Sequence, residues 1–598
     1  MTRMIPSILL AAFGFLCTIL PAQGNCLLKD IQAGPSNSLP ARFVDVFGIT
    51  YFTAADPLRG HSLWKTDGTL NGTVVVKDFY PGSGGGVQPR ELTPLGDRLV
   101  CFADDGKHGA ELWISDGTTA GTVMIRDINP GNQGQPVYMD PPTNLTPFQG
   151  RIFFSARDGI HGRELWSTDG TAAGTRMVAD IHKGSNYDDS LPSYLTPVGA
   201  TLFFFGYEKV HGWELWRTDG TTAGTSLVKD VWPGPEPGLI THNDFPFVVG
   251  VMGDTLFFAA PDAKHGYELW KSDGTTAGTV LVKDITPGSG HSRFNRNFTP
   301  AGKYLFFSAK NGVNGMELWR TDGTTGGTVL VRDINPGPAD SSPGEMAAFG
   351  DKVVFGADDG ANGTELWISD GTGSGTVMLK NIRPGSGSSM LYSRFYPIGS
   401  RYAWFTADDG RSGYELWRTD GTAAGTVLVQ DIWSGYQGSY PEYLVLSGGR
   451  IIFRARDGAN GQEPRVFFPG ATAQTRGRGF LLGGKAAALA ATDPVIGAKF
   501  HIQGRALSQA QPLFLLAGFP GPPSPIAPGL DLYLDPVGPF LGVTSFRPVP
   551  TPEWRVTFAL PASPAMNGLQ FGLQVFQLMT GTPYGFDATP GVIMTAGS

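Results

Sequence analysis

The sequence repeats itself about every 50 residues over most of its length. The core pattern Trp-x-(Ser/Thr)-Asp-Gly-Thr-x-x-Gly-Thr occurs eight times, and successive tryptophans are 48 to 54 residues apart. These tryptophans are Trp64, Trp113, Trp166, Trp216, Trp270, Trp319, Trp367 and Trp417. A pattern of this length does not recur eight times by chance, and such a period is typical of propellers and repeat arrays.

Each repeat predicts four short β-strands separated by Gly, Asp and Asn. In the second copy these strands are 91–95, 98–103, 111–114 and 123–128. The second strand is an almost continuous apolar run in most copies, for example 202–205, which is the pattern of a strand covered on both faces. Four-stranded sheets that cover one another on both faces are the blades of an all-β propeller.

The two ends of the repeat region predict how the ring closes. The last unit has three strands and lacks the fourth, and it carries Pro464 and Arg465 where other units have Leu and Trp. A matching fourth strand and exit turn stand at the other end, in Leu27 to Ile31 and the residues that follow. We therefore predict about nine blades, with the N-terminal strand closing the last one. An eight-bladed ring with one odd terminal unit and an unclosed array are the alternatives.

The motif Glu-Leu-Trp-x-x-Asp-Gly-Thr resembles the signature of the bacterial ELWxxDGT-repeat family of secreted proteins, over about three quarters of the chain. The resemblance implies secretion and a β-propeller-like architecture. Because that family is defined by its repeat and not by an activity, it supplies no catalytic residue. The chain departs from the signature at Ser62 and Leu63, where Glu-Leu is usual, at Asn381 in place of the strand Asp, and in the Pro464 and Arg465 unit.

The residues present in every repeat are expected to serve folding. The tryptophan of each third strand can bury about 150 to 250 Å², so we expect it to pack between blades. The aspartate before Gly in the turn from the third to the fourth strand is expected to accept backbone N–H bonds. Calcium at each turn is the alternative, but a turn offers one carboxylate where Ca²⁺ takes about six to eight oxygen ligands.

The turn between the second and third strands carries an acidic residue and, in four consecutive repeats, a histidine. These repeats have His108, His161, His211 and His265, and the acidic residues include Asp105 and Asp158. Equivalent positions on stacked sheets lie about 10 Å apart, too far to share one zinc ion, so a turn role is favoured. An arc of His and Asp on one face is also a candidate surface for an extended polar or acidic ligand, especially below neutral pH.

Two connections between blades are longer than the others, at 130–144 and 233–247. They bring further polar residues to the expected ligand face, namely Tyr138, Asp140, His242, Asn243 and Asp244. We take these five, together with the acidic and histidine residues of the turns, as candidate ligand-binding residues. Insertions that are simply tolerated in surface loops are the alternative interpretation.

Composition limits the partners. Hydrophobic residues make up 41% of the chain and charged residues 16%, which predicts a large core and excludes a disordered chain. The formal net charge is -8, and the 45 basic residues form no run, which argues against nucleic acid or an anionic membrane surface as a partner. The sequence leaves the oligomeric state open.

The N-terminal residues 1–24 are interpreted as a secretory signal peptide. An uncharged apolar run from Met4 to Leu20 precedes the small residues Ala22 and Gly24. A membrane anchor is the alternative, although the run is at the lower limit for spanning a bilayer. We expect a secreted or cell-surface protein with no membrane insertion after cleavage, in which the propeller covers 25–470.

The composition changes after the repeats end, over 471–598. This segment is apolar and rich in proline, and extended runs such as 512–516, 530–534 and 553–560 lie between Gly and Pro turns. Such a pattern predicts a small C-terminal β-sandwich that serves as an accessory domain.

The function expected from these features is that of a non-catalytic binding or adhesion protein, with one propeller face presented to a glycan or protein. The sequence has no Gly-x-Ser-x-Gly, no His-Glu-x-x-His, no phosphate loop and no Cys/His cluster, and no cofactor is expected. A polysaccharide lyase or glycoside hydrolase on the same scaffold is the alternative, with Asp105, Asp158, Asp359 and Asp409 as possible acids and bases. A purely structural extracellular module is the third possibility.

Overall fold

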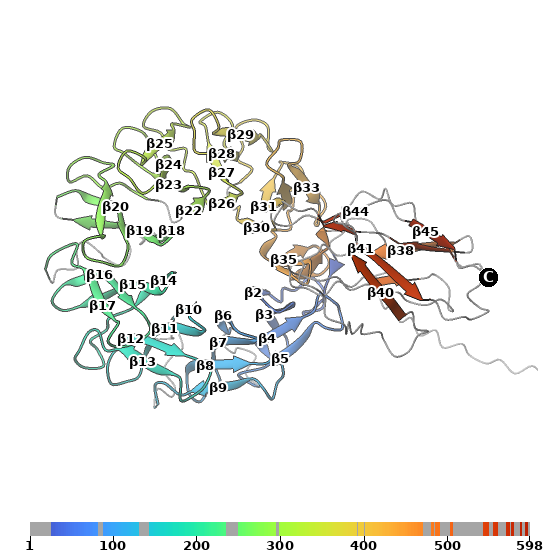
Figure 1. The fold of residues 1–598 in the computed structure, drawn as a ribbon, viewed down its shortest axis with the longest axis horizontal. Helices are drawn as coiled ribbons and strands as arrows, with labels where there is room; N and C mark the ends of the chain where they lie inside the picture. The colour runs from blue at the N-terminus through green and yellow to red at the C-terminus, as the bar shows by residue number, and fades with distance from the viewer. Residues whose placement is uncertain are drawn as a thin grey trace, which may run out of the picture. The chain divides into compact units, whose positions relative to one another are not determined.

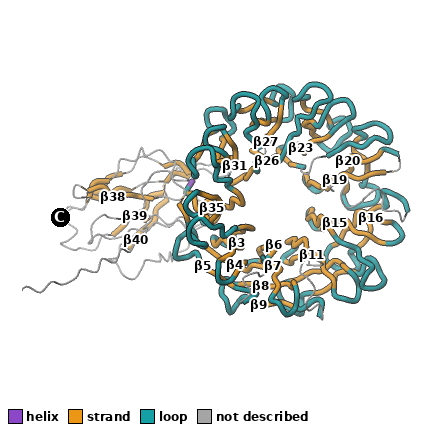
Figure 2. Tube along the Cα trace, turned by 180° about the vertical axis from the view of Figure 1, so that it is seen from behind, coloured by secondary structure: helices purple, strands orange, loops and turns teal. Residues whose placement is uncertain are grey.

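The computed structural model describes residues 26–469, apart from 82–87, 131–142, 235–248, 263, 295–297, 391–392 and 400, and nine short strands within 480–595. Nine four-stranded antiparallel sheets form a ring (Figure 1). Seen from behind in Figure 2, this ring consists of strands joined by turns and loops. The prediction of an all-β propeller with nine four-stranded blades is confirmed.

The strands of each blade run outward in sequence order, except that β1 forms the outermost strand of the last blade. The innermost strands are β2 (Ala41–Val46), β6 (Arg90–Leu95), β10 (Thr143–Phe148), β14 (Ser193–Val198), β18 (Val249–Met252), β22 (Thr299–Ala301), β26 (Met346–Phe349), β30 (Phe395–Ile398) and β34 (Glu442–Ser447). The second strands are β3 (Ile49–Asp56), β7 (Arg98–Asp104), β11 (Arg151–Arg157), β15 (Thr201–Glu208), β19 (Thr255–Asp262), β23 (Tyr304–Ala309), β27 (Lys352–Asp358), β31 (Tyr402–Asp408) and β35 (Arg450–Asp457).

The third and outermost strands complete the blades, which we number 1 to 9 from β2 onward. The third strands are β4 (Gly60–Thr66), β8 (Ala110–Ser115), β12 (Arg163–Thr168), β16 (Gly212–Thr218), β20 (Gly266–Ser272), β24 (Glu317–Thr321), β28 (Thr364–Ser369), β32 (Tyr414–Thr419) and β36 (Gly461–Phe467). The outermost strands are β5 (Val74–Lys77), β9 (Val123–Arg126), β13 (Arg176–Ala179), β17 (Ser226–Lys229), β21 (Val280–Lys283), β25 (Val329–Arg332), β29 (Val377–Lys380), β33 (Val427–Gln430) and β1 (Cys26–Leu27).

Blade 9 is assembled from both ends of the repeat region, as the sequence predicts. Its sheet has the order β1-β36-β35-β34, so the first strand of the chain forms the outer edge of the last blade. The Leu28 N–H donates to the Pro464 carbonyl at 3.0 Å and continues this pairing beyond β1. The ring is therefore closed by pairing between the two ends of the repeat region, and it is neither an eight-bladed ring nor an open array.

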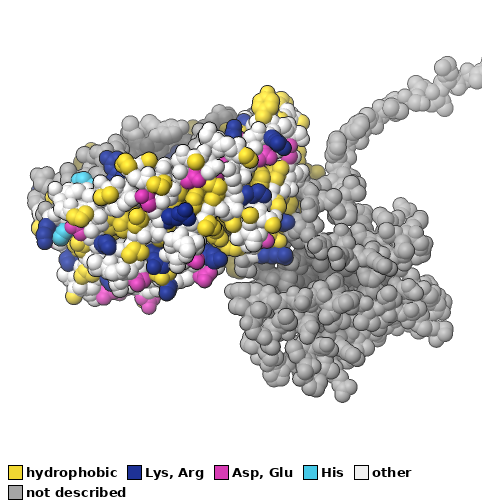
Figure 3. All heavy atoms as spheres, turned by 90° about the horizontal axis from the view of Figure 1, so that it is seen from above, with side chains coloured by type: hydrophobic (Ala, Val, Ile, Leu, Met, Phe, Trp, Pro, Cys, Tyr) yellow, Lys and Arg dark blue, Asp and Glu magenta, His cyan; other side chains and the backbone are white. Residues whose placement is uncertain are grey.

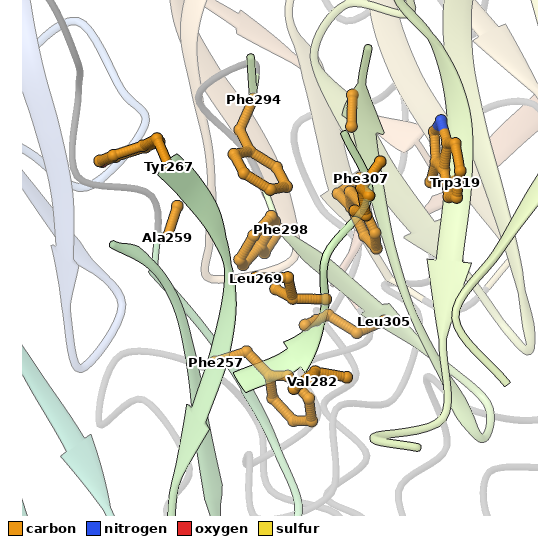
Figure 4. Close-up of a cluster of buried hydrophobic side chains, with 12 residues drawn as sticks. Phe257, Ala259, Tyr267, Leu269, Val282, Phe294, Phe298, Leu305, Phe307 and Trp319 are labelled. Carbon is orange, nitrogen blue, oxygen red and sulfur yellow. The ribbon is translucent and has the colours of Figure 1, made fainter. Parts of the chain in front are cut away.

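The core lies between neighbouring blades. Trp113 on β8 packs against Tyr51, Leu63 and Val76 of the preceding blade. Figure 4 shows the corresponding cluster between blades 5 and 6, in which Trp319 is buried with apolar residues from both sheets. Burial of one such indole contributes about 4 to 6 kcal/mol before corrections for the unfolded chain. The predicted packing of the tryptophans between blades is confirmed.

Residues Leu27–Val466 form one compact unit. Beyond it, β37 (Phe480–Leu482), β38 (Lys485–Ala490) and β39 (Gln503–Arg505) form one sheet, and three pairs follow: β40 (Gly542–Pro548) with β41 (Trp554–Ala559), β42 (Gln570–Leu573) with β45 (Val592–Thr595), and β43 (Phe576–Leu578) with β44 (Phe586–Ala588). The segment contains strands as expected, and the β-sandwich itself stays a prediction. Residues 1–24, the expected signal peptide, lie outside the described residues. Within the described part of the chain, no helix is long and apolar enough to cross a membrane.

Candidate functional site

The antiparallel strands divide the turns of the propeller between its two faces. Turns from first to second strands and from third to fourth strands lie on one face. Turns from second to third strands, which we call the 2–3 loops, lie on the other face together with the connections between blades. We call this second face the loop face, and it carries all of the sequence-predicted candidates that the structure describes.

The turn from third to fourth strand, opposite the loop face, is closed by its own side chains. Asp116 Oδ1 accepts the Thr118 N–H at 2.8 Å and the Thr118 hydroxyl at 2.7 Å, and the Thr118 Oγ1 accepts the Gly121 N–H at 2.9 Å. A Cβ on Gly121 would lie 2.1 Å from the Asp116 carboxyl group, which explains the second glycine of the motif. The Asp–Thr bonds recur in all eight copies, at Asp67, Asp116, Asp169, Asp219, Asp273, Asp322, Asp370 and Asp420.

Metal binding has no support from this geometry. The hydrogen bonds from Thr118 lower the pKa of Asp116, so the carboxylate is satisfied as an anion by its own turn. Among the residues that the structure describes, no group of three or more His, Cys, Asp or Glu side chains is placed to hold a metal ion.

A buried glutamate in the third strand of blades 2 to 9 fixes the connection that leaves the blade, and sequence analysis missed this role; blade 1 has Ser62 at this position. Glu111 is 3% exposed, and its carboxylate accepts the N–H groups of Ile128 at 2.9 Å and Asn129 at 3.3 Å. Burial raises the pKa of Glu111 to about 7, against the effect of these hydrogen bonds. The equivalent residues are Glu164, Glu214, Glu268, Glu317, Glu365, Glu415 and Glu463.

Several of these glutamates also hold the end of the connection. Glu268 accepts the Ser292 N–H at 3.2 Å and the Ser292 hydroxyl at 2.6 Å, in addition to the Ile285 N–H at 2.7 Å. One carboxylate thus fixes both ends of the backbone that leads to blade 6. The sequence signal for this role was a charged residue inside an otherwise buried third strand. A buried carboxylate needs hydrogen-bond donors that are buried with it.

The acidic residues of the 2–3 loops cap their own loops. Asp105 Oδ1 accepts the N–H groups of Lys107 and His108, both at 3.0 Å, and Asp105 Oδ2 lies 2.8 Å from His108 Nδ1. Asp158 makes the same contacts, with His161 Nδ1 at 2.7 Å. Burial opposes ionisation of Asp105, but the hydrogen bonds from His108 lower its pKa on balance. The predicted turn role therefore fits the observed bonds.

The remaining histidines follow the same arrangement in their own blades. His211 Nδ1 contacts Glu208, and His265 Nδ1 lies 2.8 Å from Asp262 Oδ2. Each of the four histidines is therefore engaged within its own loop and is not gathered with the others into a single metal site. They form an arc over the consecutive blades 2 to 5 on the loop face.

The tips of the 2–3 loops expose side chains that differ from blade to blade. The tip residue donates its backbone N–H to the cap residue two positions earlier, as Ile160 does to Asp158 and Val210 to Glu208. Because this bond uses only the backbone, the frame leaves the side chain of the tip free to vary. Four tips are large aliphatic residues: Leu58 is 78% exposed, Ile160 66%, Val210 65% and Val313 74%. Two tyrosines in connections on the same face, Tyr187 and Tyr436, are each 81% exposed.

The long connections that suggested binding are only partly described. Tyr138 and Asp140 fall within 131–142, and His242, Asn243 and Asp244 fall within 235–248, so all five lie outside the described residues. Their role in ligand binding stays a prediction.

Comparison with known proteins shows no family for this chain. No family model matches the chain. No curated protein matches it either, so the resemblance to the ELWxxDGT-repeat family rests on the motif alone. Among solved structures, puromycin hydrolase is 14% identical over 72% of this chain and 60% of its own, with a TM-score of 0.33.

Two further solved structures are similar to the same extent. Prolyl oligopeptidase B from Galerina marginata is 12% identical, with 72% of this chain and 55% of that chain covered and a TM-score of 0.36. Oligopeptidase B from Trypanosoma brucei is 11% identical, with 71% and 54% covered and a TM-score of 0.36. The chain therefore spans less than two thirds of each of these proteins.

Proposed function

We propose that this chain is a secreted, non-catalytic binding or adhesion protein whose loop face contacts a protein or glycan ligand. The observation that carries the proposal is a repeated, internally bonded loop frame with an exposed side chain at its tip that varies between blades. In blade 3, Asp158 fixes the loop backbone and leaves Ile160 66% exposed. A frame that holds variable side chains toward solvent is suited to recognition. Secretion enters the proposal from residues 1–24.

The chemistry of the tips favours a protein partner. Exposed aliphatic side chains cost free energy in water and are useful when another surface covers them. Leu58, Ile160, Val210 and Val313 all lie on the loop face, spread over blades 1, 3, 4 and 6. The exposed rings of Tyr187 and Tyr436 suit either a protein surface or the apolar face of a sugar.

The charges on the propeller suit such ligands better than a polyanion. Figure 3 shows acidic and basic side chains interspersed with apolar ones on the rim in view. The acidic caps of the 2–3 loops add further negative charge to the loop face, for example Asp105, Asp158 and Asp262. We therefore expect neutral or weakly charged ligands at neutral pH.

The carboxylates that the sequence offered for a carbohydrate-cleaving site are hydrogen-bonded within their own loops. A hydrolase or lyase needs a carboxylate that is free to exchange a proton with the substrate. Asp359 Oδ1 accepts the N–H groups of Ala361 at 3.0 Å and Asn362 at 2.8 Å, and Asp409 Oδ1 accepts the Arg411 N–H at 2.9 Å. Together with Asp105 and Asp158, these carboxylates are committed to their own loops.

The test compares tip variants with a control on the opposite face. The mature chain is screened against glycan arrays and immobilised extracellular proteins, and hydrolysis is assayed on the same polysaccharides. A variant with Leu58, Ile160, Val210 and Val313 all changed to Ser should lose at least about tenfold in affinity for any ligand found. Phe47→Ser is the control, because Phe47 is 81% exposed in the turn between β2 and β3 on the other face. Equal losses in both variants, or turnover of a polysaccharide, would contradict the proposal.

A further inference from the structure

One position in the 2–3 loops joins the loop to the end of the outermost strand of the same blade. In blade 6 this position is Asn314, whose Oδ1 accepts from Asn311 Nδ2 at 3.0 Å and whose Nδ2 donates to Asp333 Oδ2 at 2.7 Å. Asn311 belongs to the loop and Asp333 follows β25, so Asn314 links two elements. We call such a set of three side chains a clasp.

Blade 7 has the same clasp with its hydrogen bonds in the opposite direction. Asn362 Nδ2 donates to Asp359 Oδ2 at 2.8 Å, and Asn381 Nδ2 donates to Asn362 Oδ1 at 2.9 Å. The loop residue is an acceptor here, so the residue after β29 has to be a donor. Asn381, which stands where other blades have Asp, meets this requirement. In blade 9 the loop carboxylate Asp457 contacts Arg465 instead, and Asn460 Nδ2 donates to Asp30 Oδ2 at 3.2 Å. The amide centres of blades 6 and 7 thus each lie between one donor and one acceptor.

In blades 2 to 5 the three corresponding positions carry a loop carboxylate, a histidine and a carboxylate after the outermost strand, and the histidine ring contacts the loop carboxylate. In blade 3 the ends are Asp158 and Asp180, and His161 Nδ1 already lies 2.7 Å from Asp158 Oδ2. A neutral imidazole has one N–H and can donate to one carboxylate, whereas an imidazolium can donate to both. The same residue types recur as Asp105, His108 and Asp127, as Glu208, His211 and Asp230, and as Asp262, His265 and Asp284.

The charged groups around His161 favour its protonated form. The hydrogen bond to Asp158 is the largest cause that raises the pKa of His161, and Asp180 and Glu164 act in the same direction. The following connection adds Asp189, which lies close to Gly162 and is ion-paired with Arg157.

His108 in blade 2 has the same kind of surroundings. Its pKa is raised mainly by the hydrogen bond to Asp105, and Asp127 and Glu111 add to the effect. Its neighbour Lys107 is the exposed tip of the same loop. Two consecutive blades therefore surround the central histidine with acidic groups from the loop, the third strand and the end of the outermost strand.

We propose that the histidine clasps of blades 2 and 3 are operated by a proton. The protonated histidine holds the 2–3 loop against the end of the outermost strand, and loss of the proton releases the strand carboxylate. One arc of the loop face thus tightens on mild acidification, whereas the amide clasps of blades 6 and 7 do not titrate. The inference concerns the loops themselves and does not depend on which ligand the face binds.

The decisive measurement is hydrogen exchange of the full mature chain at pH 6 and pH 8, corrected for intrinsic rates, with NMR titration of the histidines. At the higher pH the loop of blade 3 should lose about tenfold more protection than the blade 7 loop around Asn362, which serves as the internal reference for any change common to the whole propeller. His161 should titrate above the ordinary range for histidine. Titration of His161 at or below that range, with equal pH responses of the two loops, would overturn the proposal.

Exchange of the clasp residues between blades 3 and 7 provides matched variants. The double substitution His161→Asn with Asp180→Asn gives blade 3 the donors and acceptors of blade 7, and it should abolish the pH response of that loop while leaving the protein folded. The reverse pair, Asn362→His with Asn381→Asp, should give the blade 7 loop a pH response that it lacks, so the proposal stays testable if the first pair unfolds. A pH response that persists in the first variant, or fails to arise in the second, would contradict it.

Discussion

The Lys29 ammonium group lies 5.8 Å from the centroid of the Trp64 ring and donates a 2.8 Å hydrogen bond to the Thr73 carbonyl. Lys29 follows the closing strand β1 of blade 9, and Trp64 and Thr73 belong to blade 1. One side chain therefore crosses the seam of the ring. The same contact between a basic residue and the tryptophan of the next blade recurs in the pairs Lys77 and Trp113, Arg126 and Trp166, Lys229 and Trp270, Arg332 and Trp367, and Lys380 and Trp417.

Substitution of Lys29 by Met should destabilise the propeller by about 1 to 2 kcal/mol. Met keeps most of the apolar stem, so the change removes mainly the cation–π contact and the hydrogen bond to Thr73. Chemical denaturation followed by tryptophan fluorescence measures the free energy of unfolding. Lys107→Met is the control, because Lys107 is exposed at a loop tip and should change stability by less than about 0.5 kcal/mol. A Lys29 variant as stable as the control would show that the contact across the seam contributes nothing.

Substitution of Glu463 by Ala should open the seam. Glu463 is fully buried and accepts the N–H groups of Ile31 at 3.1 Å and Gln32 at 3.3 Å, and both the N–H and the hydroxyl of Ser38. Loss of these bonds leaves buried donors unpaired, which costs about 3 kcal/mol. Limited proteolysis within residues 28–38 should become at least tenfold faster.

Glu317→Ala is the matched control for the seam. Glu317 accepts the Ile334 N–H at 2.8 Å and the Ser341 N–H and hydroxyl. The segment that it holds joins β25 to β26, and β25 is itself linked through a turn to β24 of the same blade. The control should therefore lose comparable stability without exposing residues 28–38 to protease. Equal cleavage of this segment in both variants would mean that Glu463 has no special part in closing the ring.

The buried glutamates predict a propeller that is more stable at mildly acidic pH than at pH 8. Burial raises the pKa of Glu268 to about 7, against hydrogen bonds from Ser292 and Ile285, whereas the unfolded chain has the ordinary value near 4.5. A group with a raised pKa in the folded state contributes its full stability below 4.5 and loses it as the pH rises through about 7. Glu268→Gln should reduce the pH slope of the free energy of unfolding by at most about 1.4 kcal/mol per pH unit in this window.

Acid should act on a different set of carboxylates. The pKa values of Asp105 and Asp158 are lowered, so their contribution is present above 3.8 and is lost as the pH falls through their folded values. Stability should therefore peak between the two windows, at about pH 4 to 5. Urea unfolding from pH 3 to 9 measures the profile. A maximum at pH 8, or an identical profile for Glu268→Gln, would contradict the assignment to the glutamates.

Most of the architecture could be predicted from the sequence because each blade solves the same packing problem with the same residues. The tryptophan spacing reports one sheet per repeat, and the missing fourth strand of the last unit could be matched to Leu28 and its neighbours. The role of the glutamates could not be found this way. The partners of Glu111 are backbone N–H groups 17 and 18 residues later. Every residue except proline has a backbone N–H, so the sequence does not distinguish these two from the others.

The clasps show a second limit of sequence reasoning. Asn381 looked like a departure from the repeat, and its reason appears only when Asp359, Asn362 and Asn381 are placed together and their donors and acceptors are compared. Likewise, the sequence assigned the histidines of blades 2 to 5 to turns, but only the structure shows that each ring contacts an acidic residue of its own loop. The candidates in 131–142 and 235–248 stay predictions.

Removal of calcium should leave the propeller unchanged, because the turn aspartates are already satisfied. Asp322 Oδ1 accepts the Thr324 N–H at 2.9 Å and the Thr324 hydroxyl at 2.7 Å, and these bonds lower the pKa of Asp322. Asp322→Ala should cost about 1 kcal/mol through the two lost bonds, whereas Asp322→Asn keeps an acceptor and should cost less than half of that. The thermal unfolding midpoint should be the same with chelator and with added Ca²⁺. A midpoint that rises with Ca²⁺ in the wild type but not in Asp322→Asn would show that the turn carboxylates bind the ion.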